Sequence, residues 1–361
     1  MREIEGRRRL ASRIERFHGV GLERVMAEIE YLRDDGDTVI AGGSLAHGLG
    51  NGLSDLDMLV SSPAAVKSSR VPLEHFLGSL RVDVWKLGQG AIEASFGRAE
   101  EALASERPLL GRFGDSDHED EFKLLHRIAF GLVLDGDGLE LEGQGRDWRG
   151  VASGLVLREY AERMRAAALV AQLALRAGRP IAAAVNARLA VESALNAALT
   201  ARGFPFVSDK WLGERLGDAI GLADLYEPFR RLPADPAGEG AGFADAALVA
   251  CAELWELDLG FEAVVPLARW RRSEELRLAS AGGEQLLLAP RSGAVWALEQ
   301  GEAGAWRRLE AEAGEQGWAL AGRDPEETTL CVRLFELGLL GLGWTEGVPA
   351  AALGAGREVG A

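Results

Sequence analysis

Cysteine is scarce in this sequence: only Cys251 and Cys331 occur among 361 residues. The two are far apart and stand in apolar segments with the residue pattern of helices. This pair can supply neither a framework of disulfides nor a zinc site built on cysteine. We expect both side chains to be buried, reduced thiols.

Long hydrophobic runs are also missing. Residues 1–17 lack the apolar stretch of a signal peptide, and no window approaches the roughly 18 continuous apolar residues of a transmembrane helix. The sequence therefore predicts no membrane span, and the cytoplasm is the expected location.

Positive charge is in deficit. The chain has 40 Lys and Arg against 56 Asp and Glu, which gives a formal net charge of -16 at pH 7. A uniformly basic surface is excluded, so broad non-specific binding of DNA or RNA is not expected. Hydrophobic residues make up 47%, which suits a globular protein, and the length predicts two or three domains.

The first part of the chain alternates between helix-like and strand-like patterns. Apolar residues at helical spacing predict a helix across residues 1–35. Short β-branched or alternating runs predict strands at 38–41, 55–60 and 81–85. A helix or helix-to-strand element is expected over 118–134.

The residue pattern of the remaining sequence changes twice. Alanine-rich helices are expected at 151–177 and 181–202, followed by one or two helices within 210–230, a loop at 232–240 and a helix at 243–262. Strands at 276–278, 285–289 and 293–298 then precede helices around 302–313 and 325–338. We predict an α+β multidomain protein with a mixed-sheet domain (1–145), a helical bundle (150–265), a small winged-helix-like domain (268–346) and a disordered tail (347–361).

A glycine-rich stretch from Gly42 to Asp57 carries the clearest chemical signal. It follows a strand-like run, and its Gly43-Ser44 pair begins a turn. Glycine lets a backbone approach a phosphate closely, and the N–H groups of the turn can hold phosphate oxygens together with the Ser44 hydroxyl. Gly43 and Ser44 are therefore candidates for binding a triphosphate. Ser54 either donates hydrogen bonds to the loop or phosphate, or only shapes the turn.

Two acidic residues lie at the end of this stretch, and a third lies further along the chain. Asp55 and Asp57 share one face of a predicted strand, because residues i and i+2 point to the same side. Asp83, on a second predicted strand, can join them. Neighbouring carboxylates repel one another unless a cation lies between them, and Mg²⁺ suits one or two carboxylates plus substrate phosphates. The pattern predicts a site for Mg²⁺ or Mn²⁺ built from Asp55, Asp57 and Asp83.

Together, these residues resemble the motif of the polymerase-β-like nucleotidyltransferase superfamily, over roughly residues 30–140. The resemblance is nearest to the minimal and the kanamycin-type nucleotidyltransferases. It implies transfer of a nucleoside monophosphate, most simply AMP from ATP, to an acceptor. Asp55 and Asp57 would then bind metals that clamp the α-phosphate and the leaving pyrophosphate, and Asp83 would share the metal that activates the acceptor oxygen. His47 is expected to be a loop contact and not a catalytic group.

The helix pair at 151–202 and the segment that follows it resemble the helical, HEPN-related domain of kanamycin-type enzymes. In antibiotic-modifying members, a glutamate of that domain is the general base, and Glu192 is the candidate here. Its alternative is a solvated glutamate on a helix surface. Lys210 is a candidate for neutralising a triphosphate, Arg188 is a similar candidate for binding phosphate or substrate, and Trp211 is expected in the core.

Residues 270–345 resemble the PqqD-like domains that recognise peptides, through the predicted hairpin at 286–298 and the helices after it. Such domains add a leader peptide as a strand to the edge of a sheet. The resemblance makes a ribosomally made precursor peptide the leading acceptor. The alternatives are a small hydroxylated antibiotic and, in another class, an antitoxin-type protein that acts on or binds a HEPN partner.

Overall fold

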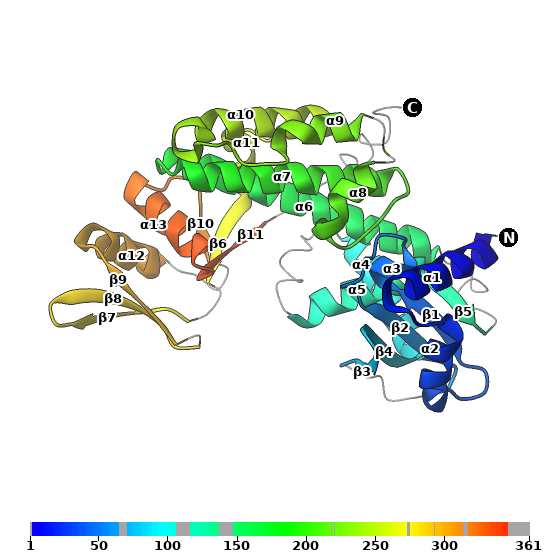
Figure 1. Cartoon of the computed structure of the whole chain (residues 1–361). Helices are drawn as coiled ribbons and strands as arrows, with labels where there is room; N and C mark the ends of the chain where they lie inside the picture. Colours follow the sequence, from blue (N-terminus) through cyan, green and yellow to red (C-terminus); the bar gives the residue numbers. More distant parts are fainter. Residues whose placement is uncertain are drawn as a thin grey trace. The chain divides into compact units, whose positions relative to one another are not determined.

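The computed structural model describes residues 2–64, 71–105, 116–136, 147–217, 219, 221–272, 275–291, 293–312 and 317–345. The predicted tail at 347–361 lies outside these residues. The chain divides into two compact units, of which the first comprises Met1–Ser105, Asp115–Val156 and Phe206–Arg215. The second contains Leu157–Pro205 and Leu216–Ala361. Helices and mixed and antiparallel sheets make the protein α+β, as predicted (Figure 1).

A five-stranded mixed sheet forms the centre of the first unit, with strand order β3-β4-β2-β1-β5. Strands β2 and β4 run parallel, and the other neighbours are antiparallel. Its two central strands, β2 and β1, are buried along their whole length. The strands are β1 (Thr38–Gly42), β2 (Leu56–Ser62), β3 (Leu73–Leu77), β4 (Leu80–Gly88) and β5 (Leu132–Asp135).

Helices of the first unit cover this sheet. Leu10 and Ile14 of α1 and Val25 of α2 are buried in one core with the apolar residues of the strands. The helix predicted across 1–35 is interrupted at Gly19, whose positive φ of 66° no helix residue adopts. The elements are α1 (Arg2–His18), α2 (Leu22–Ile29), η1 (Glu30–Leu32), α3 (Gly43–Ala46), α4 (Gln89–Ala104) and α5 (Ser116–Phe130).

Long helices dominate the middle of the chain. The α7 and α10 helices pack together, and the Trp255 indole N–H donates to the Ala194 carbonyl at 3.1 Å. The helices are α6 (Trp148–Arg176), α7 (Pro180–Ala201), η3 (Asp209–Trp211), α8 (Leu212–Leu216), α9 (Leu222–Tyr226), η4 (Glu227–Phe229), α10 (Pro236–Trp255), α11 (Phe261–Val264) and η5 (Val265–Leu267).

The loop predicted at 232–240 is partly wrong, because α10 already begins at Pro236. The Asp235 side chain caps this helix by accepting a hydrogen bond from the Gly238 backbone N–H, and proline is well suited to a first helical position. The proline that suggested a loop therefore starts a helix.

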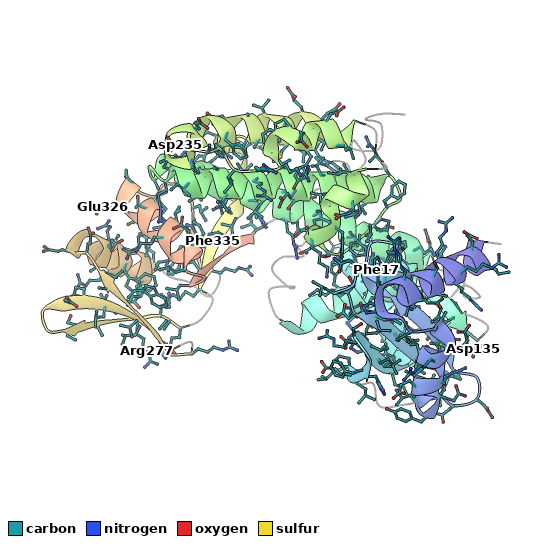
Figure 2. All side chains as sticks on the ribbon, in the orientation of Figure 1. Phe17, Asp135, Asp235, Arg277, Glu326 and Phe335 are labelled. Atoms are coloured by element: carbon teal, nitrogen blue, oxygen red, sulfur yellow. The ribbon has the colours of Figure 1, made fainter. Side chains whose placement is uncertain are left out.

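The C-terminal part of the second unit contains two three-stranded antiparallel sheets, ordered β10-β6-β11 and β7-β8-β9. Its core is aromatic: the Trp306 and Trp318 rings lie 5.7 Å apart, and Trp270 lies 5.7 Å from Phe335, which Figure 2 labels on α13. The elements are β6 (Ala268–Arg272), β7 (Arg277–Ala281), β8 (Glu284–Ala289), β9 (Ala294–Leu298), α12 (Gln300–Glu312), β10 (Trp318–Ala319), α13 (Pro325–Glu336) and β11 (Leu340–Trp344).

Two expectations drawn from scarce residues can be compared with this fold. Cys251 and Cys331 are both buried and free, as predicted, and burial raises the pKa of each thiol to about 12. Among the helices of the described residues, none has both the length and the apolar character needed to cross a bilayer.

Candidate functional site

The loop between β1 and β2 brings a carboxylate against the backbone of Gly43. Gly43 has a positive φ of 73°, which favours glycine. A Cβ atom at this position would lie 2.1 Å from Oδ2 of Asp57, far inside van der Waals contact. Only glycine therefore lets the turn pass so close to the Asp57 side chain.

Hydrogen bonds within the loop fix its path. The Ser44 carbonyl accepts from the backbone N–H groups of Leu49 at 2.9 Å and Gly50 at 3.0 Å. Near the other end, the Ser54 hydroxyl accepts from the Asn51 backbone N–H at 3.0 Å. Ser54 is buried and bonded to its own turn. Its observed contacts are those of a residue that shapes the loop.

The three acidic residues meet where the beginning of β2 lies beside β4. Asp57 on β2 is in register with Asp83 on the parallel strand β4, and Asp55 immediately precedes β2. Nη2 of Arg81 donates to Oδ2 of Asp55 at 2.7 Å and to Oδ2 of Asp83 at 2.8 Å. Arg127 of α5 forms an ion pair with Asp57, with 3.0 Å between Nη2 and Oδ1.

Burial opposes ionisation of these acids. The pKa of Asp57 is raised to about 6, chiefly by burial. The charges of Asp55 and Asp83 also raise it, and the Arg127 charge opposes the rise. The pKa of Asp83 is also raised by burial, against the opposing effect of Arg81. The cluster therefore holds more negative charge than its surroundings favour, which is the electrostatic condition for attracting a cation.

The donor set suits a hard divalent ion, although the side chains are not arranged around one. Within the described residues, no group of three or more His, Cys, Asp or Glu side chains could hold a metal ion as it stands. Guanidinium groups lie against the carboxylates instead. Asp83 nevertheless has one buried oxygen, Oδ1, without a hydrogen-bond partner in the described part of the chain. Carboxylate oxygens of this kind are the ligands that Mg²⁺ takes alongside substrate phosphates.

A cavity of about 280 Å³ opens beside these acids within the first unit. Its lining combines carboxylates with lysine and arginine side chains, so it offers groups for both a cation and phosphates. It is lined by Gly43, Ser44, Asp55, Asp57, Lys123, His126, Arg127, Phe206, Val207, Ser208 and Lys210.

Phe206 anchors the segment that supplies Lys210. Its ring is buried and lies 5.2 Å from the ring of His47 and 5.7 Å from that of His126, edge-on in both cases. His47 is thus a loop contact, as expected, and burial followed by the Arg215 charge lowers its pKa to about 4. The anchored segment places Ser208 and Lys210 in the wall of the cavity.

Sequence reasoning missed part of this wall. Lys123, His126 and Arg127 are spaced i, i+3 and i+4 on α5, so they share one helix face. That spacing in the sequence indicates a shared cationic face, but a cationic helix face is most often exposed to solvent. What makes these residues part of a site is the strand β1 beside α5, because a Cβ on Gly42 would lie 3.0 Å from Cβ of Arg127.

Glu192 lies in the second unit, where it is half-buried on α7. Its Oε1 accepts from Nε of Arg188 at 2.9 Å and from the Tyr226 hydroxyl at 3.1 Å. Burial raises the pKa of Tyr226, and the Glu192 charge raises it further. Glu192 is therefore a bonded, partly covered carboxylate, and its predicted role as a base stays a prediction. Trp211 is buried, as expected.

Comparison with known proteins gives little further information. No protein-family model and no curated protein matches the chain. Among solved structures, it is similar to a nucleotidyltransferase-like protein from Exiguobacterium sibiricum, with 12% sequence identity and a TM-score of 0.35. The match covers 73% of this chain and 96% of that one. Because so low a TM-score carries no argument about fold or activity, the chemistry of this chain has to be inferred from its own residues.

Proposed function

We propose that this protein is a metal-dependent nucleotidyltransferase that moves a nucleoside monophosphate, AMP from ATP, to an acceptor. The observation that carries the proposal is one cavity whose lining includes Ser44 and the acids Asp55 and Asp57 together with two lysines, Lys123 and Lys210. A nucleoside triphosphate with its divalent ion has the matching arrangement of charge.

The carboxylates of Asp55, Asp57 and Asp83 would hold Mg²⁺ or Mn²⁺. Such an ion, when bound, supplies Lewis-acid stabilisation of charge on the phosphoryl oxygens. The chain's own contribution is to hold these three side chains on two adjacent strands, where the register of β2 and β4 fixes Asp57 beside Asp83. Pre-positioned charge of this kind is the main source of catalysis in phosphoryl transfer.

The phosphates would be bound by the remaining lining of the cavity. Ser44 and Ser208 have hydroxyl groups that can donate to phosphate oxygens, and the lysines at positions 123 and 210 provide positive charge. The close approach of the backbone at Gly43 leaves the turn's N–H groups near the same space. These groups orient the α-phosphate for attack by the acceptor.

Glu192 is the proposed base for the acceptor hydroxyl. Arg188 and Tyr226 both donate to its Oε1, so Oε2 is the oxygen that would take the proton.

The proposed acceptor is a ribosomally made precursor peptide. In the sheet ordered β7-β8-β9, β7 and β9 are edge strands. An edge strand can pair with an added peptide through main-chain hydrogen bonds. Val295 on β9 is 57% exposed, which leaves an apolar side chain for a peptide to cover.

Calorimetric titration with ATP, GTP, CTP and UTP in the presence of Mg²⁺ tests the nucleotide part. Binding of at least one nucleotide, and release of pyrophosphate that stops when the metal is chelated, are expected. If no nucleotide bound more tightly than about 1 mM, near −4 kcal/mol, the assignment would be wrong.

Removal of residues 268–346 tests the acceptor. For a peptide acceptor, the shortened protein should show a higher KM for the peptide and unchanged ATP affinity. An unchanged KM for every peptide, with transfer to a small hydroxylated antibiotic or to a HEPN-type protein, would replace the peptide by one of those acceptors.

A further inference from the structure

A single nitrogen atom of Arg81 joins two of the carboxylates. Nη2 lies 2.7 Å from Oδ2 of Asp55 and 2.8 Å from Oδ2 of Asp83. Arg81 precedes Asp83 by two residues on β4, so the strand directs both side chains to the same face. The contact with Asp83 is local to β4, whereas the contact with Asp55 depends on the pairing of β2 with β4.

We propose that Arg81 is a resident counter-ion that holds Asp55 and Asp83 together before metal binds and that a divalent ion must displace. The inference rests on the metal site of the proposed function. Asp55 and Asp83 would hold the metal through carboxylate oxygens, and the Oδ2 oxygen of each is already occupied by Nη2 of Arg81. A metal that used these oxygens would compete with Arg81 for them.

The surroundings of the two arginines differ in a way that selects Arg81 for displacement. Its side chain is 44% exposed, so it can move into solvent with less loss of packing than a more buried arginine. The Arg127 side chain is only 23% exposed, and its guanidinium carbon lies 4.7 Å from the centre of the Trp85 ring. Arg127 is therefore expected to stay beside Asp57 when metal arrives.

The surroundings of Asp83 favour replacement of the arginine by a metal ion. The residue is 6% exposed, and its Oδ1 is buried with no hydrogen-bond partner among the described residues. A buried, unpaired oxygen of an acid is costly, and Arg81 contacts only Oδ2. A divalent ion offers several coordination positions and its own water ligands, which can satisfy the oxygen that Arg81 leaves unpaired.

The consequence is a metal affinity set by competition. When the binding-competent state is only a fraction of the population, the apparent dissociation constant rises by the inverse of that fraction. With Arg81 away from the carboxylates about one tenth of the time, its removal would strengthen metal binding about tenfold.

Titration of the full-length protein with Mn²⁺, followed by the electron paramagnetic resonance of the free ion, tests this. Arg81→Gln should bind Mn²⁺ about tenfold more tightly than the native protein, and Arg81→Lys, which keeps a cation, should remain near native. Arg9→Gln is the charge-matched control, because Arg9 is exposed and paired with Glu5. Screened charge alone should change its affinity by less than about twofold.

The outcomes separate Arg81 from the metal site. If Arg81→Gln bound Mn²⁺ like the native protein while Asp83→Asn weakened binding, the site would stand and the role of Arg81 would be refuted. If neither the native protein nor Arg81→Gln bound Mn²⁺, the inference would fall together with the metal site. Unchanged thermal unfolding of Arg81→Gln would show that any change in affinity comes from the site.

Discussion

The candidate residues of each unit include a carboxylate paired with an arginine, but the two pairs span very different lengths of chain. In the second unit, Arg188 and Glu192 are four residues apart on α7, and the pair is local to one helix. In the first unit, Arg127 of α5 reaches Asp57 of β2, seventy residues earlier in the chain. A helix forms the first kind of pair by its own geometry, whereas the second kind exists only once the sheet and α5 are packed.

The balance of charge also differs. Glu192 has one arginine and a tyrosine hydroxyl on a single oxygen. The other cluster has three carboxylates and two guanidinium groups, and burial raises the pKa of Asp57 to about 6. A balanced pair is suited to holding one side chain in place, and an excess of negative charge is suited to binding a cation. Substitutions in both units can test whether this contrast between the balanced pair and the acidic cluster has a function.

The largest effect is expected for the acidic cluster. Replacing Asp55 and Asp57 by Asn should lower metal-dependent pyrophosphate release by about 10³-fold or more, because the charges that hold the metal are lost. The control is Asp34→Asn, an exposed carboxylate that pairs with Lys86 outside the cavity. Release by the double variant at the native rate would show that the cluster is not catalytic.

The next effect concerns the balanced pair. If Glu192 is the base, Glu192→Gln should lower turnover by about 10²-fold with ATP affinity unchanged, because general base catalysis contributes about 10²–10⁴-fold. Glu227→Gln is a matched control, since Glu227 is exposed and pairs with Arg230 in the same unit. Lower thermal stability with native turnover would reduce the Arg188–Glu192 pair to a structural element and erase the contrast.

A smaller effect is expected at the loop of the first unit. Ser44→Ala removes one hydroxyl that faces the cavity, and a hydrogen bond to a charged group contributes about 1.5–3 kcal/mol. The affinity for ATP should therefore fall by about 10- to 150-fold. Ser61→Ala, which alters a buried serine of β2 outside the lining, should leave the affinity unchanged. Equal ATP affinities for native protein and Ser44→Ala would contradict a phosphate-binding loop.

The smallest effect is on stability in acid. Burial and the Arg215 charge lower the pKa of His47 to about 4, below its ordinary 6.5. The unfolded chain binds the proton first, so this stability is present above about pH 6.5 and is lost as the pH falls towards 4. Denaturant unfolding should show a loss of about 1–3 kcal/mol over this range that His47→Gln reduces. Titration of His47 near 6.5 by nuclear magnetic resonance would contradict the prediction.

Some of the fold could be predicted because the responsible interactions are local. The strands β1, β2 and β4 are mostly buried apolar runs, and the long helices are rich in alanine with no proline inside them. The edge strand β3 escaped prediction because its residues are mostly exposed and lack alternation. Strands β6 and β11 pair across some seventy residues of sequence, which no local pattern reveals.

The candidate site also has one part that local sequence predicts and another part that depends on tertiary packing. The motif of Gly43, Ser44, Asp55 and Asp57 lies within one loop and its flanking strands, and the structure places all four on one cavity. The cationic side of that cavity comes from α5 and from the segment that Phe206 anchors. Whether these two segments line the cavity depends on the packing of two histidines against a phenylalanine in the folded protein. No spacing in the sequence predicts that contact.

Phe206 and its neighbours also limit how the protein can be divided. The first unit includes Phe206–Arg215, although the residues on either side of this segment belong to the second. The chain therefore passes between the units repeatedly, and no single proteolytic cut or gene truncation separates them cleanly. A fragment that stopped at residue 156 would keep the acidic motif but lose Phe206, Ser208 and Lys210 from the cavity wall. The two units are thus expected to be inherited together, as one indivisible module.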